Sequence, residues 1–306
     1  MDRFDAMTVL VTAVDEGSLA RAGRKLGRSP AAVSRAVAFL EDRLGTQILH
    51  RTTRSIKLSE AGEHYATVCR QVLTELKEAE LQAAGEQSSP RGTLSITAPV
   101  FSGEEILRPI LSQFLERHPN VAARLHLLDR FVNMMDEGID VAVRIGHLRD
   151  SSMVGIRVGE VRRVIAAAPS YLNKHGAIED LSDLSHHQII GHPQFGLDSW
   201  TFPPLDGSTI PRTVQFTPIF TVNSVRAAVA ATIEGNGVTR LLSYQLADHV
   251  AEGRLQIVLP SEETEPWPVT LVTPQGRLSI PKVRAFVDFA LPLLRARYTQ
   301  LSMTSA

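Results

Sequence analysis

SLARAGRKLGRSPAAVSRAVAFLEDRLG, residues 18–45, contains two helix starts, each followed by a glycine stop. Ser18 is placed to cap a short helix that ends at Gly27. Ser29 and Pro30 are typical of the N-cap and first position of a second helix, which runs to Gly45. Upstream, residues 2–16 carry apolar side chains at helical spacing. Three helices joined by short turns are therefore predicted.

The helix after Ser29 has two contrasting faces. Its predicted apolar stripe, which faces the other two helices, comprises Val33, Val37, Leu40 and Leu44. The opposite face carries Ala31, Ser34, Arg35 and Ala38. Small residues let a helix lie deep in the major groove of DNA, where Ser34 and Arg35 reach phosphates or base edges. This pattern favours a recognition helix; the alternative is that the alanines simply reflect helix propensity.

The segment after Gly45 changes its period. In TQILHRTTRSIKLSEAG, residues 46–62, Ile56 and Leu58 alternate with Lys57, which is typical of a strand. HRTTRS between two apolar segments indicates a hairpin tip that exposes Arg51 and Arg54. A basic hairpin beside a helix-turn-helix is a wing, which adds affinity through the DNA backbone.

Positive charge is concentrated in the same region. Residues 18–58 contain nine lysines and arginines but two acids, although the formal net charge of the 306-residue chain is −1. A basic module on an acidic remainder predicts a nucleic-acid footprint confined to the N-terminus. A merely solvated basic face is the alternative. Because Phe39 is the only aromatic residue of this segment, duplex DNA is favoured over single strands.

A long helix is predicted after the N-cap Ser59. Its narrow apolar stripe comprises Tyr65, Val68, Val72, Leu76, Ala79 and Ala83. A lone helix cannot bury that stripe on a sixty-residue domain, so a second copy of the chain is the expected partner; packing on its own C-terminal domain is the alternative. Cys69 lies beside the stripe and is predicted to be a packing residue. The Gly/Ser/Pro-containing segment at residues 85–92 indicates a hinge.

From Thr93 onward strands and helices alternate. The first strand (93–98), a helix (105–119), a strand (121–128), a short helix (134–140) and a strand (141–146) predict a parallel sheet. A second set follows, and the chain then returns to the first unit. The predicted domains are a winged helix-turn-helix (1–58), a linker helix (59–86), a hinge (87–92) and an effector-binding domain (93–306). In the last, lobe I is 93–161 with 267–306, and lobe II is 162–266.

A small molecule is expected between the two lobes, beyond the carboxyl ends of the strands. Pro99, Val100 and Phe101 follow the first strand, and Ser102 is predicted to cap the next helix, whose N-terminus favours an anion. A carboxylate with an apolar or aromatic body is therefore the expected effector. The other predicted effector contacts are Ile145, Gly146, Phe195, Trp200 and Asn223. For Phe195 and Trp200 ordinary core packing is the alternative.

Several other classes of protein are disfavoured. One cysteine excludes an intrachain disulfide, and the opening MDRFDAMTVL does not resemble a signal peptide, which predicts a cytoplasmic protein that does not enter a membrane. His186, His187 and His192 have no matching ligand spacing and are expected on the surface, so neither a metal nor a cofactor is predicted. No nucleophile-elbow, zinc-protease or Walker motif is present, and no enzyme activity is predicted.

Residues 18–62 resemble the DNA-binding domain of LysR-type transcriptional regulators, notably in SPAAVSR (29–35) and in the LSEAG close (58–62). DVAVRIG (140–146), RRVIAAAPSYLNKHG (162–176) and AAVAATIEGNGVTRLLSYQLADHVAEGRLQIVLP (227–260) are similar to the effector domain of that family, which is itself like a periplasmic binding protein. The resemblance thus covers nearly the whole chain. It implies an α+β multi-domain protein: winged helix-turn-helix, long linker helix and two-lobed α/β effector domain.

The resemblance also implies partners and contacts. Double-stranded DNA, a small-molecule effector, a homodimer through the linker helix, a homotetramer and, for an activator, RNA polymerase are the expected partners. The DNA-binding set is Ser29, Pro30, Ala31, Ser34, Arg35, Arg51, Thr52 and Arg54, the last three on the backbone. The expected function is effector-controlled, sequence-specific DNA binding. The alternatives are a cytoplasmic small-molecule-binding protein or enzyme with a helical appendage, and a pure dimerisation scaffold.

Overall fold

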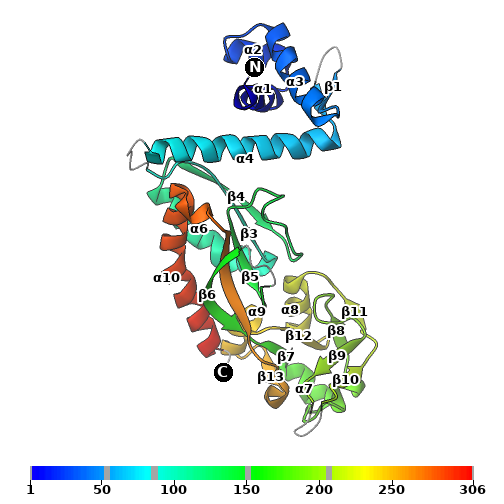
Figure 1. The fold of residues 1–306 in the computed structure, drawn as a ribbon. Coiled ribbons are helices and arrows are strands. Elements are labelled where there is room, and N and C mark those ends of the chain that lie inside the picture. The colour runs from blue at the N-terminus through cyan, green and yellow to red at the C-terminus, as the bar shows by residue number, and fades with distance from the viewer. Residues whose placement is uncertain (1, 52–55, 84–88, 149–152, 205–208, 305–306) are drawn as a thin grey trace.

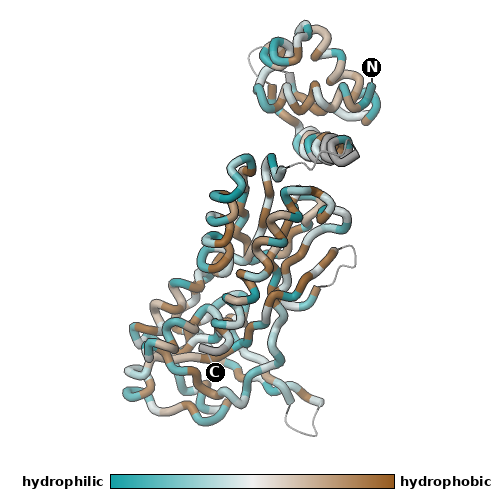
Figure 2. The backbone as a smooth tube through the Cα atoms, turned by 90° about the vertical axis from the view of Figure 1, so that its left-hand side faces the viewer, coloured by the Kyte–Doolittle hydropathy of each residue, from teal (hydrophilic) through white to brown (hydrophobic). Residues whose placement is uncertain are grey.

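The computed structural model describes residues 2–51, 56–83, 89–148, 153–204 and 209–304. A small helical unit at the N-terminus is followed by one long helix, α4, and then by two α/β lobes (Figure 1). Figure 2 shows the N-terminal unit standing apart from the lobes, with α4 between them. No helix of the described residues is long and apolar enough to cross a lipid bilayer.

The N-terminal unit consists of three helices and a two-stranded hairpin. Its elements are α1 (Arg3–Glu16), α2 (Leu19–Lys25), α3 (Pro30–Leu44), β1 (Leu49–Arg51) and β2 (Ile56–Leu58). The helix boundaries follow the predicted signals: Gly17 takes a left-handed φ of 61°, and the hydroxyls of Ser18 and Ser29 accept N–H bonds from the first turns of α2 and α3. β1 and β2 pair antiparallel, as expected for the two strands of the predicted hairpin, whose tip at 52–55 lies outside the described residues.

The inner face of α3 differs in one position from the prediction. Val33, Val37 and Leu40 are fully buried in the helical core, whereas Leu44 is 40% exposed. Leu44 is the last residue of the helix, and its place in the core is taken by Ile48, which follows the turn. The core of this unit comprises Ala6, Met7, Val9, Leu10, Ala13, Ala22, Val33, Ala36, Val37, Leu40, Ile48, Leu49 and Cys69.

The long helix α4 (Glu60–Ala83) is fixed to the helical unit at its N-terminal end. The Ser59 hydroxyl accepts the N–H of Gly62 and donates to the carbonyl of Gln47 at 2.6 Å. Ala66 and Cys69 are buried against the helical unit, in contact with α1. Cys69 is therefore a packing residue, as predicted. Of the predicted stripe, Val68 and Val72 are half-buried and Leu76 is 37% exposed, while the side chains of Ala79 and Ala83 lie outside the described residues.

Lobe I is built on a five-stranded sheet in the order β4-β3-β5-β14-β6. Its strands are β3 (Gly92–Ala98), β4 (Val121–Leu127), β5 (Val141–Ile145), β6 (Met153–Val161) and β14 (Trp267–Pro274). The first three are mutually parallel, as the alternating pattern predicts, and β14 returns antiparallel between β5 and β6. The helices α6 (Arg108–Arg117) and α10 (Pro281–Thr304) flank this sheet (Figure 1).

Two helix predictions in lobe I are wrong in detail. The helix expected at 105–119 begins earlier, with α5 (Val100–Ser102) and a π-helical turn (Gly103–Leu107) ahead of α6. The helix expected at 134–140 is a turn. There the side-chain oxygen of Asn133 accepts the N–H of Met135, and Gly138 takes a φ of 64°. Asn and Gly favour such turns because they hydrogen-bond locally and tolerate positive φ.

Lobe II holds a second five-stranded sheet in the order β11-β8-β12-β7-β13, with a separate hairpin of β9 and β10. The strands are β7 (Arg163–Ala167), β8 (Ile189–Gly191), β9 (Ser199–Phe202), β10 (Arg212–Gln215), β11 (Phe220–Thr221), β12 (Val238–Leu242) and β13 (Gln256–Val258). The helices are α7 (Pro169–His175), α8 (Val225–Ile233) and α9 (Ser243–Ala251).

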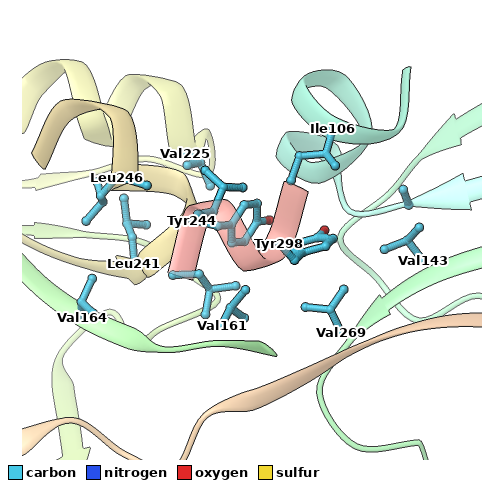
Figure 3. Packing of buried hydrophobic residues seen from close by; sticks show 14 of the residues in the cluster. Ile106, Val143, Val161, Val164, Val225, Leu241, Tyr244, Leu246, Val269 and Tyr298 are labelled. Carbon is cyan, nitrogen blue, oxygen red and sulfur yellow. The ribbon is translucent and has the colours of Figure 1, made fainter. Parts of the chain in front are cut away.

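The two lobes share one continuous apolar core. Figure 3 shows Tyr244 of α9 and Tyr298 of α10 next to each other, with Val269 and Ile106 of lobe I and Leu241 and Leu246 of lobe II around them. The Tyr244 and Tyr298 rings meet edge to face, 6.0 Å between centroids. The chain crosses between the lobes twice, from β6 to β7 and again before β14, so lobe I is assembled from distant segments.

Candidate DNA-binding surface and effector cavity

The outward face of α3 presents most of the predicted DNA-contacting residues. Pro30, Ala31 and Arg35 are exposed, and Ser34 is half-buried on the same side of the first two turns. Ser29 is exposed, but its hydroxyl accepts the N–H of Ala32 at 3.2 Å. The helix start is therefore held by a local cap, while its outer surface is free of bulky side chains. Small residues around one arginine give the profile that fits a major groove.

Two side chains fix the position of α3: one forms an ion pair with α1, and the other accepts hydrogen bonds from the start of the hairpin. Arg28, just before the helix, forms a bidentate pair with Asp5 of α1 at 2.6 and 2.8 Å, and this pairing lowers the pKa of Asp5. Glu41 accepts the N–H groups of Ile48 and Leu49 and so ties α3 to the hairpin. Arg28 is one of the nine basic residues of 18–58, and no local spacing in the sequence links it to Asp5.

The wing is described in its strands only. The backbone of Arg51 pairs with Ile56 at the end of β1. The side chain of Arg51, and the whole of Thr52 and Arg54, lie outside the described residues. Their predicted backbone contacts stay predictions.

A cavity of about 410 Å³ opens between the two lobes. Lobe I contributes the carboxyl ends of β3, β4 and β5, lobe II contributes the start of α9, and the crossing strand contributes Trp267. The lining residues are Pro99, Leu128, Asp129, Arg130, Phe131, Arg144, Ile145, Gly146, His147, Gln194, Leu242, Tyr244, Gln245 and Trp267. Its volume lies within the range of small-molecule sites.

Three of the predicted effector residues line this cavity: Pro99, Ile145 and Gly146. Phe101 instead lines a second cavity of about 510 Å³, where its ring meets Tyr244 edge to face at 5.7 Å. Val100 is half-buried at the start of α5, and its N–H donates to the carboxylate of Asp129 at 3.0 Å. The protein's own carboxylate therefore stands where an anionic effector was expected.

The capping prediction for Ser102 is wrong. The helix starts at Val100, and Ser102 is fully buried inside it with no capping bond. Its hydroxyl is bonded to the hydroxyl of Tyr298 at 2.7 Å. Burial raises the pKa of Tyr298, so both hydroxyls are neutral and serve to join α10 to the start of this helix.

The remaining predicted contacts of lobe II are not among the residues lining the cavity. Trp200 is 1% exposed and packs against Phe216 at 4.8 Å, and Phe195 is buried in the same lobe. Asn223 is exposed, next to Ser224, which caps α8. The alternative of core packing thus holds for Phe195 and Trp200.

Of the three histidines expected on the surface, His192 is buried. Its Nδ1 accepts the N–H of Gln194, and burial lowers its pKa. His187 is half-buried beside Tyr171. In the described part of the chain, no group of three histidine, cysteine or acidic residues is arranged to hold a metal ion.

Most of the polar residues that line the cavity were not predicted from the sequence. Asp129, Arg144, Gln194 and Gln245 come from four different segments. Asp129 directly follows a predicted strand (121–128) and Arg144 lies near the end of another (141–146), which is a usable signal at the carboxyl edge of a parallel sheet. Gln194 and Gln245 carry no such signal, because the approach of lobe II is a tertiary feature.

The fold combines an exposed recognition helix beside a wing, a long helix, and a two-lobed domain with a cavity between its lobes. These features define the class of effector-controlled DNA-binding regulators. Residues 4–63 match the model of the bacterial regulatory helix-turn-helix of the lysR family, and residues 87–295 match the LysR substrate binding domain. The chain belongs to the LysR family of transcriptional regulators.

Named relatives agree in length and fold. The chain is 31% identical to the HTH-type transcriptional regulator CrgA of Neisseria meningitidis over 93% of its own length and 95% of the relative. It is 31% identical to an HTH-type transcriptional repressor of Pseudomonas aeruginosa over 96% of its length and 92% of the relative. The solved structure of the Neisseria regulator superimposes with a TM-score of 0.60 at 29% identity, covering 95% of this chain and 98% of the other.

Proposed function

We propose that this regulator reads its operator through the outward face of α3, and that a small molecule in the 410 Å³ interlobe cavity controls the outcome. The observation that carries the DNA part is the exposure of Pro30, Ala31 and Arg35 on one side of a helix whose other side is fully buried. Arginine is suited to base recognition because its guanidinium pairs with the major-groove edge of guanine. The protein acts in the cytoplasm, without enzymatic turnover.

The proposed assembly is a homodimer joined through α4. Val68, Val72 and Leu76 retain exposed apolar surface along α4. A second α4 packed on this stripe removes that surface from water, which favours association. The dimer also provides two recognition helices, one for each half-site; a dimer of dimers and contact with RNA polymerase belong to the same proposal.

The test is a gel-shift titration with the purified chain, the DNA adjacent to its own gene and excess nonspecific duplex, at two salt concentrations. We expect saturable, competitor-resistant binding that weakens as salt rises, because bound phosphates release counterions. Failure to retain any fragment of a genome-wide pool would replace this proposal with a ligand-binding protein that does not act on DNA.

The first prediction concerns Arg35 in the same assay. Arg35→Ala should weaken operator binding about tenfold or more and relax the preference for one base pair, since a lost arginine–guanine pair costs roughly 1–3 kcal/mol. Arg43→Ala removes the same charge from the last turn of α3 and serves as the control. Equal effects of the two variants on specific and nonspecific DNA would show that Arg35 does not read bases.

A further inference from the structure

Arg28 lies where the three helices of the N-terminal unit meet. Its backbone N–H donates to the carbonyl of Gly23 in α2 at 2.7 Å. Its guanidinium donates two hydrogen bonds to the carboxylate of Asp5, in the first turn of α1, at 2.6 and 2.8 Å. The next residue, Ser29, caps α3. One residue therefore connects α1, α2 and the start of the recognition helix.

The turn between α2 and α3 is packed closely on α2. A Cβ added to Gly23 would lie 2.6 Å from the carbonyl oxygen of Arg28, and Gly27 takes a left-handed φ of 65°. These backbone contacts attach Arg28 to one helix, and its ion pair with Asp5 attaches it to another. Two attachments on different helices restrict how the N-terminal end of α3 can move.

The ion pair acts on direction more than on charge. A bidentate contact between an arginine and a carboxylate holds both groups in one geometry. Asp5 and Arg28 together carry no net charge, so the pair adds little to the general attraction between the protein and DNA phosphates. Base readout by a side chain of α3 such as Arg35 depends on hydrogen bonds, which weaken steeply when donor and acceptor are misaligned.

We propose that Asp5 and Arg28 are positioning residues for operator recognition, whose ion pair sets the orientation of α3 and so favours specific over nonspecific DNA. This inference rests on the function of α3 proposed above. The pair acts through α3, and neither residue has to contact a base. Specific binding depends on the pair because base contacts need an exact helix position, whereas attraction to phosphates tolerates small displacements.

The experiment compares the wild type with Asp5→Asn/Arg28→Gln in the full-length chain. This double change removes the ion pair at constant net charge, and both side chains are partly exposed, so no core packing is lost. Binding is measured on the operator fragment retained in the gel-shift titration and on a nonspecific duplex, at several salt concentrations. Operator affinity should fall about threefold to fivefold, the range that an exposed ion pair allows. Nonspecific affinity and its salt dependence should stay the same.

Two further double variants serve as rescue and control. Asp5→Arg/Arg28→Asp reverses the pair, again at constant net charge, and should recover most of the lost operator affinity. Glu16→Gln/Lys25→Gln removes the other exposed pair between α1 and α2, which spans 2.7 Å and joins the last residues of those helices. This control should bind the operator like the wild type, because its ion pair does not include the turn before α3.

The inference is overturned by unchanged operator affinity in the neutral double variant, by an equal loss in the Glu16 and Lys25 control, or by no recovery in the reversed pair. An equal loss on operator and nonspecific DNA also overturns it and makes Arg28 a phosphate contact. Arg35→Ala is measured alongside. If that variant loses operator binding and the neutral double variant does not, only this inference fails; if the wild type retains no operator, the proposed function fails as well.

Discussion

At the residue scale, the contacts that hold this protein together join side chains far apart in sequence. The Ser102 and Tyr298 hydroxyls are an example, since both are buried and each is the hydrogen-bond partner of the other. When a buried hydroxyl loses its hydrogen-bond partner, the free-energy cost of removing it from water is no longer offset by a hydrogen bond. Such pairs fix α10 against the cavity-bearing lobe.

Tyr298→Phe should lower stability by about 1–3 kcal/mol, because it leaves the Ser102 hydroxyl buried and unpaired. Ser102→Ala should do the same to Tyr298. The double variant should be less destabilised than the sum of the two, as a double-mutant cycle on chemical denaturation curves reports. Simple additivity of the two losses would mean that the hydroxyls do not interact.

Cys69 gives a second prediction at this scale. Its thiol is fully buried in the helical core, and burial raises its pKa. The reactive thiolate of Cys69 therefore forms only at a pH above the usual pKa of a free cysteine, which is about 8.5. Burial also blocks contact between the thiol and a reagent. At pH 8 the native protein should react with Ellman's reagent far more slowly than the protein in 6 M guanidinium. Rapid reaction of the native form would contradict this burial.

At the element scale, the first turn of α4 is tied to the wing by close backbone approach. A Cβ placed on Gly62 would overlap the carbonyl oxygen of Ile48, a backbone atom that cannot turn aside. The N–H of Ser59 also donates to that carbonyl at 3.0 Å. The orientation of the long helix relative to the recognition helix thus depends on a glycine.

Gly62→Ala should therefore destabilise the N-terminal unit by about 1–3 kcal/mol, despite the higher helix propensity of alanine. It should also reduce operator affinity, because α4 must shift relative to the wing. The control is Glu63→Ala, an exposed change in the same turn. Thermal melts and gel shifts measure both effects, and a more stable Gly62→Ala would show that the close approach is not needed.

At the scale of the whole molecule, the lobes are held by core packing and by an ion-pair bridge. Arg226 of α8, in lobe II, bonds to Glu104 at 3.0 Å and to Glu105, both in lobe I. These side chains are partly exposed, so the bridge contributes little to stability. Its position across the lobes makes it relevant to their opening.

Arg226→Gln should weaken the contact between the lobes and change the free energy of unfolding by no more than about 1 kcal/mol, as expected for an exposed ion pair. The difference from the wild type should vanish in 1 M salt, because salt screens exposed charges. Arg284→Gln, which breaks an exposed pair within α10, is the control. A difference that persists in 1 M salt would assign Arg226 a role other than charge pairing.

The sequence by itself predicted the winged helix-turn-helix, the long helix and the parallel strands of lobe I. Caps, glycine stops and apolar spacing depend on neighbours within a few residues, so the elements that they predict are also found in the folded protein. Ser29, Pro30 and three of the four predicted stripe positions of α3, Val33, Val37 and Leu40, fall where their spacing placed them.

The tertiary structure alone decided which polar groups are hydrogen-bond partners of each other. Ser102 is 196 residues from Tyr298, and Asp129 lies 29 residues from the N–H that it accepts. Hydrogen-bond partners at such separations follow from the packing of the lobes, which no local pattern encodes. For the same physical reason the sequence predicted Ser102 as a helix cap beside the effector, while the packed structure buries its hydroxyl against Tyr298.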